Sequence, residues 1–209
     1  MRLTKPKLSK PSVLPALAIA ACSLSLYWIE ASAAANKHLE DSLASVSADQ
    51  AAAEAFEAII PVLHHPRCMN CHSRGDFPRQ GDDRHQHTMK VRRGTNGDGL
   101  GAVRCSSCHQ DHNLAGPHTP PGAPGWHLPS PAMPMIWEGL SDRQLCELFK
   151  DPKQNGGRNV REIVDHMKTP LVLWGWNPGE GRNPITMPHA EFLSKMSEWA
   201  REGAGCPES

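Results

Sequence analysis

The chain lacks an excess of charge of either sign. Its 209 residues include 22 basic and 22 acidic side chains. Removing residues 1–35, which hold four basic residues and one acidic residue, leaves a net charge of −3 with histidine neutral. A protein that binds the phosphate backbone needs a basic surface, so nucleic acid is not an expected partner.

Apolar residues are also scarce, because hydrophobic side chains make up only 39% of the chain and aromatic ones 5%. Nineteen prolines and seventeen glycines indicate much loop, and no segment has the pattern of a long strand. We therefore expect a mostly α fold with extensive irregular loops. Such a chain needs something further to pack around, and a large apolar cofactor would serve.

Residues 1–35 have the pattern of an export signal. A positive start is followed by the apolar stretch 13–29 and by small residues in ASAAAN, which suit signal peptidase. We therefore expect a periplasmic protein in an oxidising compartment. Two alternatives remain open. Cys22 ends IAAC, which is similar to a lipoprotein box, and the apolar stretch is near the lower length limit of an uncleaved anchor. A membrane partner is expected only in these two cases.

The remaining chain divides into a flexible leader, residues 36–50, and one domain, residues 51–209. Hydrophobic spacing and capping residues predict four helices, at 51–64, 142–150, 158–167 and 189–203. Between them, the glycine-rich stretch 73–104 and the proline-rich stretch 113–135 predict long loops.

The pattern C-x-x-C-H occurs twice, and it is the attachment signal for c-type haem. In this pattern two thiols bind the haem vinyl groups and the histidine is an axial iron ligand. The residues are Cys68, Cys71 and His72 in the first motif and Cys105, Cys108 and His109 in the second. A shared zinc site and disulfides are the alternatives, but a Cys₄ zinc site gives no reason for a histidine after each pair. We expect two covalent haem c groups.

Only 36 residues separate His72 from His109. This is short for two consecutive single-haem domains, so we expect both haems to share one cytochrome c-like unit and to lie close together. Fast electron exchange between them would follow.

The second axial ligand of each iron is not settled by the sequence. AMPMIWEGLSDRQL resembles the methionine ligand loop of class I cytochromes c, which implies Met133 or Met135 as ligand of the second haem. For the first haem the candidates are His85, His87, Met89, Met187 and His189. Packing and hydrogen bonding are the ordinary roles of such residues.

Cys146 and Cys206 flank predicted helices and follow an export signal. In an oxidising compartment we expect a disulfide between them, with two free buried thiols as the alternative.

Together the blocks HPRCMNCH, GDDRHQHTM, RCSSCHQDHN, WEGLSDRQLC, LVLWGWNPG and GAGCP resemble a family of exported dihaem cytochromes labelled isoquinoline 1-oxidoreductase subunits. The resemblance covers residues 56–207. It implies an electron-transfer subunit that accepts electrons from an exported molybdenum hydroxylase or aldehyde dehydrogenase-type enzyme, and it leaves the terminal acceptor open. The alternatives are a dihaem peroxidase and a haem-based redox or gas sensor.

Overall fold

The computed structural model describes residues 16–209. The first fifteen residues of the predicted export signal lie outside the described part. The chain divides into two units, residues 1–46 and 47–209, and helix α1 (Ala16–Leu63) belongs to both. No helix among the described residues has the length and apolar character required to cross a bilayer.

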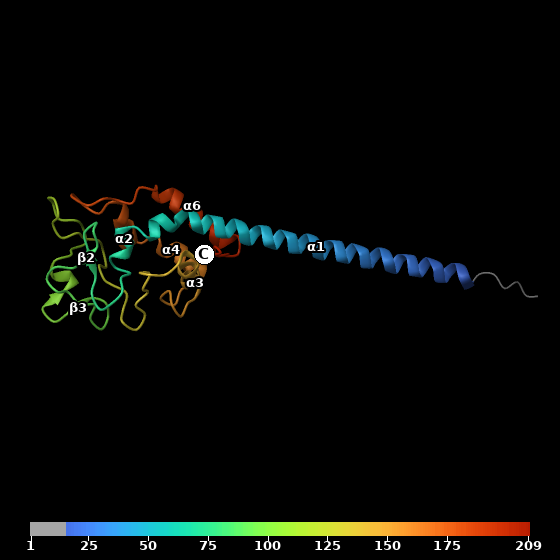
Figure 1. Cartoon of the computed structure of the whole chain (residues 1–209), viewed down its shortest axis with the longest axis horizontal. Helices are drawn as coiled ribbons and strands as arrows, with labels where there is room; N and C mark the ends of the chain where they lie inside the picture. The colour runs from blue at the N-terminus through green and yellow to red at the C-terminus, as the bar shows by residue number, and fades with distance from the viewer. Residues whose placement is uncertain (1–15) are drawn as a thin grey trace, which may run out of the picture. The chain divides into compact units, whose positions relative to one another are not determined.

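Regular structure is mostly helical, as expected, and the strands are only two residues long (Figure 1). After α1 the elements are α2 (Pro66–Met69), β1 (Arg79–Gln80), β2 (His85–Gln86), β3 (Gly99–Leu100), β4 (Val103–Arg104), η1 (Cys105–Ser107), α3 (Asp142–Lys150), α4 (Val160–His166), α5 (Pro170–Leu173), η2 (Trp174–Trp176) and α6 (His189–Arg201).

Residues 36–50 differ from the expectation, because they are helical and part of α1 rather than a flexible leader. The segment contains neither glycine nor proline, the two residues that are least favourable inside a helix. Pro61 lies inside the helix, which ends two residues later at Leu63. Proline removes a helical hydrogen bond, so an end at this point is expected.

The hydrophobic core of residues 47–209 lies where the last turns of α1 meet α3, α4 and α6. Phe56 of α1 is fully buried and lies edge-on to Phe149, with ring centroids 5.7 Å apart. Its ring also contacts Trp199 at 5.3 Å. The predicted buried faces are confirmed at Leu145 and Met196, both without exposed surface.

Side-chain caps begin two of the helices, α3 at Asp142 as expected and α4 at Val160, two residues later than expected. Ser141 accepts a hydrogen bond from the Gln144 backbone amide, and the Gln144 side chain accepts one from the Ser141 amide. Asn159 and Glu162 form the same reciprocal capping box at α4. Such caps satisfy amides that have no partner inside the helix.

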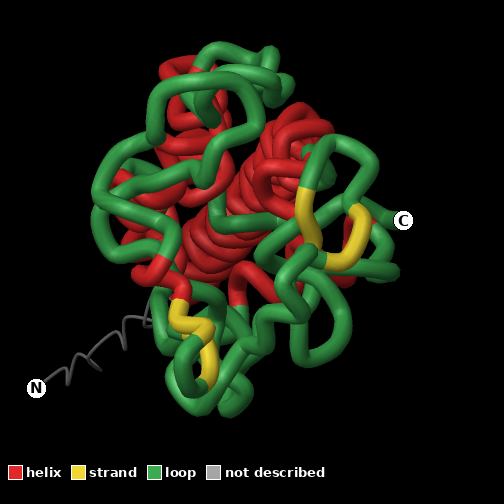
Figure 2. The backbone as a smooth tube through the Cα atoms, turned by 90° about the vertical axis from the view of Figure 1, so that its left-hand side faces the viewer, coloured by secondary structure: helices red, strands yellow, loops and turns green. Residues whose placement is uncertain are grey.

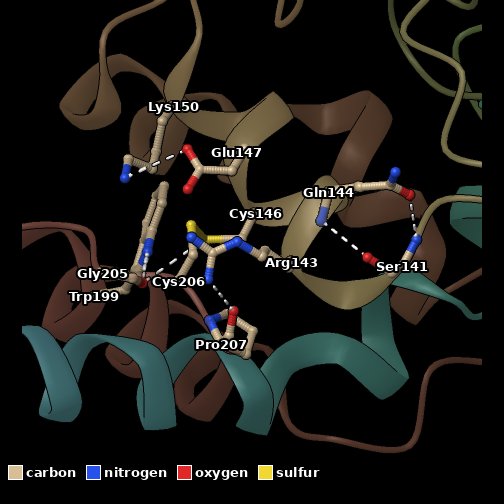
Figure 3. The surroundings of a disulfide bond; sticks show 10 residues. All are labelled: Ser141, Arg143, Gln144, Cys146, Glu147, Lys150, Trp199, Gly205, Cys206 and Pro207. Carbon is tan, nitrogen blue, oxygen red and sulfur yellow. Dashed lines mark hydrogen bonds and ion pairs between the residues drawn. A yellow bond between two sulfur atoms is a disulfide. The ribbon is translucent and has the colours of Figure 1, made fainter. Parts of the chain in front are cut away.

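A disulfide joins Cys146 of α3 to Cys206, as expected (Figure 3). Nearby, the indole of Trp199 donates to the carbonyl of Gly205, and Arg143 donates to the carbonyl of Pro207. The C-terminal tail is therefore tied to both α3 and α6.

Loops make up most of residues 73–141. Two antiparallel hairpins interrupt them, β1 with β2 and β3 with β4, and these form two separate sheets (Figure 2). The long loops and the absence of long strands among the described residues agree with the proline and glycine content.

Candidate functional site

The first C-x-x-C-H motif begins immediately after α1. His65 caps α2, because its Nδ1 accepts a hydrogen bond from the Arg67 amide, and Pro66 occupies the first helical position. The amides of Cys71 and His72 both donate to the carbonyl of Cys68, at 3.2 Å each. One helical turn therefore brings the two thiols and the imidazole to the same side of the chain.

The imidazole of His72 is held in one orientation. Its Nδ1 donates to the carbonyl of Met135 at 2.9 Å, and its ring lies flat against Trp137 with centroids 3.6 Å apart. Because a carbonyl can only accept, Nδ1 must carry the proton and Nε2 keeps its lone pair. This is the arrangement that protein metal sites use to orient a histidine ligand.

The second motif repeats this arrangement on a different scaffold. It follows the hairpin β3–β4, and a single 3₁₀ turn, η1, places the amides of Cys108 and His109 on the carbonyl of Cys105. His109 Nδ1 donates to the carbonyl of Pro121 at 2.7 Å, and its ring stacks on Trp126 at 4.5 Å with a 5° tilt. Its Nε2 is therefore also the nitrogen with a free lone pair.

Gly122 explains how the Pro121 carbonyl reaches the second motif. The backbone of Gly122 passes so close to the carbonyls of Gln110 and His112 that a Cβ atom there would overlap both. In addition, the Gly122 amide donates to the Asn113 side chain at 3.1 Å. Glycine is required here for close approach of two backbones rather than for an unusual dihedral angle.

A cavity of about 130 Å³ adjoins the first motif and is open to solvent on one side. Its lining is mostly apolar, as in ligand pockets of proteins. The lining includes both cysteines and His72, together with apolar residues of the core and of the loops: Leu63, Phe149, Ile163, Met167, Val172 and Trp176.

Burial controls the protonation of the first motif. It raises the pKa of Cys68 to about 12 and that of Cys71 to about 11, so both thiols are protonated at neutral pH. Burial also lowers the pKa of His72 to about 4, so its imidazole is neutral. A neutral imidazole is the form that binds a metal.

The four motif cysteines are free thiols in the structure, whereas the pair at Cys146 and Cys206 is oxidised. Among the described residues, no three His, Cys, Asp or Glu side chains converge as a metal cluster.

Cationic side chains lie beside the thiols of the first motif. Arg67 pairs with Asp82 and lies 5.6 Å from the ring of Trp174, while its buried Nε has no partner among the described residues. Arg93, only 1% exposed, donates to the backbone carbonyl of Pro129 at 2.7 Å. A guanidinium at the cavity wall suits a ligand that carries carboxylates.

These features fit the c-type haem expected from the sequence. Each motif offers two thiols and an imidazole with Nε2 available, and the first motif opens into an apolar cavity that also contains the unsatisfied Arg67 Nε. Arg67, Arg74 and Arg104 flank the two motifs in the sequence, and of these three only Arg67 lines this cavity. Arg74 binds Glu138, and Arg104 pairs with Asp98.

The two sites adjoin each other. Trp126 stacks on His109 of the second motif and also lines the cavity of the first. Trp174 lines the same cavity and meets Trp126 edge-on, with centroids 4.9 Å apart. The two motifs are also close enough to interact electrostatically. Burial raises the pKa of Cys71, Arg93 opposes this shift, and Cys105 of the second motif adds to it.

Two of the candidate axial ligands lie at the opposite motif from the expected one. Met135, expected at the second haem, lines the first cavity, and its carbonyl holds His72. His87, expected at the first haem, faces His109 with ring centroids 6.2 Å apart. Burial and the neighbouring His109 lower the pKa of His87, so it is neutral as well.

The other candidates have different partners. The sulfur of Met133 accepts a hydrogen bond from the Gly156 amide, and His189 Nε2 bonds to the carbonyl of Met167 at 3.0 Å. The Met187 carbonyl accepts from the Trp176 indole while the residue packs partly buried against the core. His85 pairs with Asp83 at the surface, and Met89 is 70% exposed.

Two further histidines, His127 and His166, line the first cavity, and the sequence analysis did not single them out. Burial, together with the charge of Arg158, lowers the pKa of His166 to about 4. His166 follows the buried Ile163 by three residues in α4, so helical periodicity indicates the same inward face. No comparable pattern marks His127, which lies in a loop.

Comparison of the chain with protein-family models, with curated proteins and with solved structures gave no match.

Proposed function

We propose that this protein is a periplasmic dihaem c-type cytochrome that transfers electrons. The observation that carries the proposal is the matched pair of histidines. In each C-x-x-C-H motif, Nδ1 is bound to a backbone carbonyl and the ring lies flat on a tryptophan. A zinc-binding or redox-active cysteine pair gives no reason for this arrangement to occur twice.

When bound, haem supplies a reversible one-electron iron couple. The side chains of this chain hold and orient it. The four motif thiols would hold the haem groups through thioether bonds, in which each sulfur is joined to one carbon of a former vinyl group and the thiol proton to the other. His72 and His109 would provide Nε2, while their Nδ1–H bonds keep the rings from turning. The mostly apolar wall around the first site would lower the local dielectric constant, which is one of the means by which proteins set a potential.

The electron donor follows from the sequence resemblance. That resemblance implies an exported molybdenum hydroxylase or aldehyde dehydrogenase-type enzyme as redox partner, with this chain as a non-catalytic subunit. The absence of a positive net charge in the mature sequence agrees with a protein partner rather than a polyanion.

The test is a count of haem by the pyridine haemochrome assay on full-length protein from a host competent in c-type maturation. Two haems per chain are expected. The Cys68→Ala/Cys71→Ala and Cys105→Ala/Cys108→Ala variants should each retain one. The matched control is Cys146→Ala/Cys206→Ala, which should retain both. A wild-type chain without haem, despite competent maturation, would refute the proposal.

A further inference from the structure

We propose that His87 and His109 bind one iron from opposite faces, which makes the second haem a bis-histidine centre. This inference rests on the proposed function and adds the axial ligand of the second site. It also replaces the sequence-based expectation of methionine there.

The distance between the two rings is the first argument. Two imidazoles on opposite faces of one metal ion place their centroids about 6 Å apart, since each metal–nitrogen bond is about 2 Å and each nitrogen lies about 1 Å from its centroid. The observed separation of His87 and His109 is 6.2 Å, at an interplanar angle of 67°. Rings in direct stacking contact lie closer, as His109 and Trp126 do at 4.5 Å.

Unsatisfied hydrogen-bonding capacity is the second argument. His87 Nδ1 is buried and has no partner among the described residues. A buried polar atom without a partner costs free energy, so it calls for an explanation. On the other side of the gap, His109 uses Nδ1 on the Pro121 carbonyl and has Nε2 left. Both rings therefore have bonding capacity that the described residues do not use.

The backbone fixes His87 at this position. It directly follows the hairpin β1–β2, in which Gln80 pairs with His85. The His87 amide donates to the Pro78 carbonyl at 3.1 Å, and the next amide, of Thr88, donates to the Gln80 side chain. The ring is thus carried by an anchored turn, as a ligand position requires.

His85 provides the contrast within the same loop. It is exposed, and its Nδ1 lies 2.6 Å from Asp83. Its hydrogen-bonding capacity is used locally and its ring is not among those facing His109. Of the two histidines in RHQH, only His87 has the position and the free capacity of an axial ligand.

The test uses full-length protein matured with haem, in the variants His87→Gly and His85→Gly. Haem is counted first, and two per chain in both variants would show that attachment is intact. In the ferric state, His87→Gly should turn one low-spin haem high-spin, and in the ferrous state it should bind one more carbon monoxide per chain than wild type. Adding imidazole should restore the low-spin spectrum. His85→Gly should match wild type.

The outcomes separate the two proposals. No haem in the wild-type chain refutes the proposed function. Two haems in His87→Gly with wild-type spectra and wild-type carbon monoxide stoichiometry refute the ligand assignment alone. If His87→Gly does not retain two haems, His87→Met decides. A low-spin second haem with a raised potential supports the assignment, since methionine ligation raises the potential, whereas an unchanged potential and spectrum overturn it.

Discussion

The two C-x-x-C-H regions achieve the same histidine geometry with very different supports. The first motif lies between α1 and the helical core, and its cavity is walled by core side chains. The second follows the hairpin β3–β4, whose strands have two residues each, and begins with a single 3₁₀ turn; its Cys108 is exposed. What they share comes from elsewhere in the chain, because residues 121–137 supply both carbonyl acceptors and both stacked tryptophans.

The comparison shows that the groups that orient a histidine, here a carbonyl acceptor and a stacked tryptophan, need not lie in a helix or a strand. Proline restricts its own backbone and that of the preceding residue, so a proline-rich segment holds its carbonyls in place without a ladder of hydrogen bonds. Residues 121–137 contain five prolines. The stiffness that helices give to the first site is given to the second by this segment.

The largest expected difference between the two sites concerns the stacked tryptophans. Trp137 is buried and also packs on Phe149, whereas Trp126 is half-buried. Trp137→Ala should lower the free energy of unfolding by about 3–5 kcal/mol, the usual cost of removing a large buried ring. Trp126→Ala should cost about 1–2 kcal/mol, since less surface is buried. Denaturant titration measures both, and equal costs would contradict the comparison.

The next largest effect is expected on removal of the disulfide, which joins α3 of the helical core to the C-terminal tail. The bond closes a loop of 60 residues, and its loss should lower the free energy of unfolding by about 2–4 kcal/mol. We expect Cys146→Ala/Cys206→Ala to perturb the absorption bands of the first haem more than those of the second. Spectra of the variant, recorded alongside the single-haem variants of each motif, would assign the change. A perturbation confined to the second haem would be the opposite result.

A smaller effect, selective for the second site, is expected at Gly122. A methyl group there would meet the carbonyls of Gln110 and His112, so Gly122→Ala must displace the segment that carries the Pro121 carbonyl. Overpacking of this kind costs about 1–3 kcal/mol. The lower occupancy or altered spectrum should appear at the second haem only. Gly125→Ala separates overlap from backbone strain, because a Cβ at that position has no neighbour within 4 Å and only the left-handed φ of +72° opposes the substitution.

The smallest effect, taken per pH unit, is a pH dependence at the first site. Because burial lowers the pKa of His166 to about 4 from an ordinary value of 6.5, the unfolded chain binds this proton first on acidification. The stability from the neutral side chain is therefore complete above pH 6.5 and is lost as the pH falls toward 4. His166→Gln should reduce the slope of stability against pH in that window, by at most about 1.4 kcal/mol per unit. Identical slopes would show that His166 is not the responsible group.

Most local features of this protein could be predicted from its sequence, whereas most contacts between distant residues could not. The capped start of α3 follows from Ser141 and its neighbours, and the disulfide is expected because only two cysteines of the mature sequence remain outside the motifs in an oxidising compartment; both are present. The structure places Met135 and His87 beside the motifs opposite to those expected from the sequence. His72 bonds to a residue 63 positions away, and such a contact depends on how long loops close rather than on any local pattern.

The reach of residues 121–137 across both sites has a mechanical consequence. One stretch of backbone holds the Nδ1 protons of His72 and His109 at its two ends. A displacement of this stretch, in which Pro124 and Gly125 are exposed, would therefore change the hydrogen bonds of both imidazoles at once.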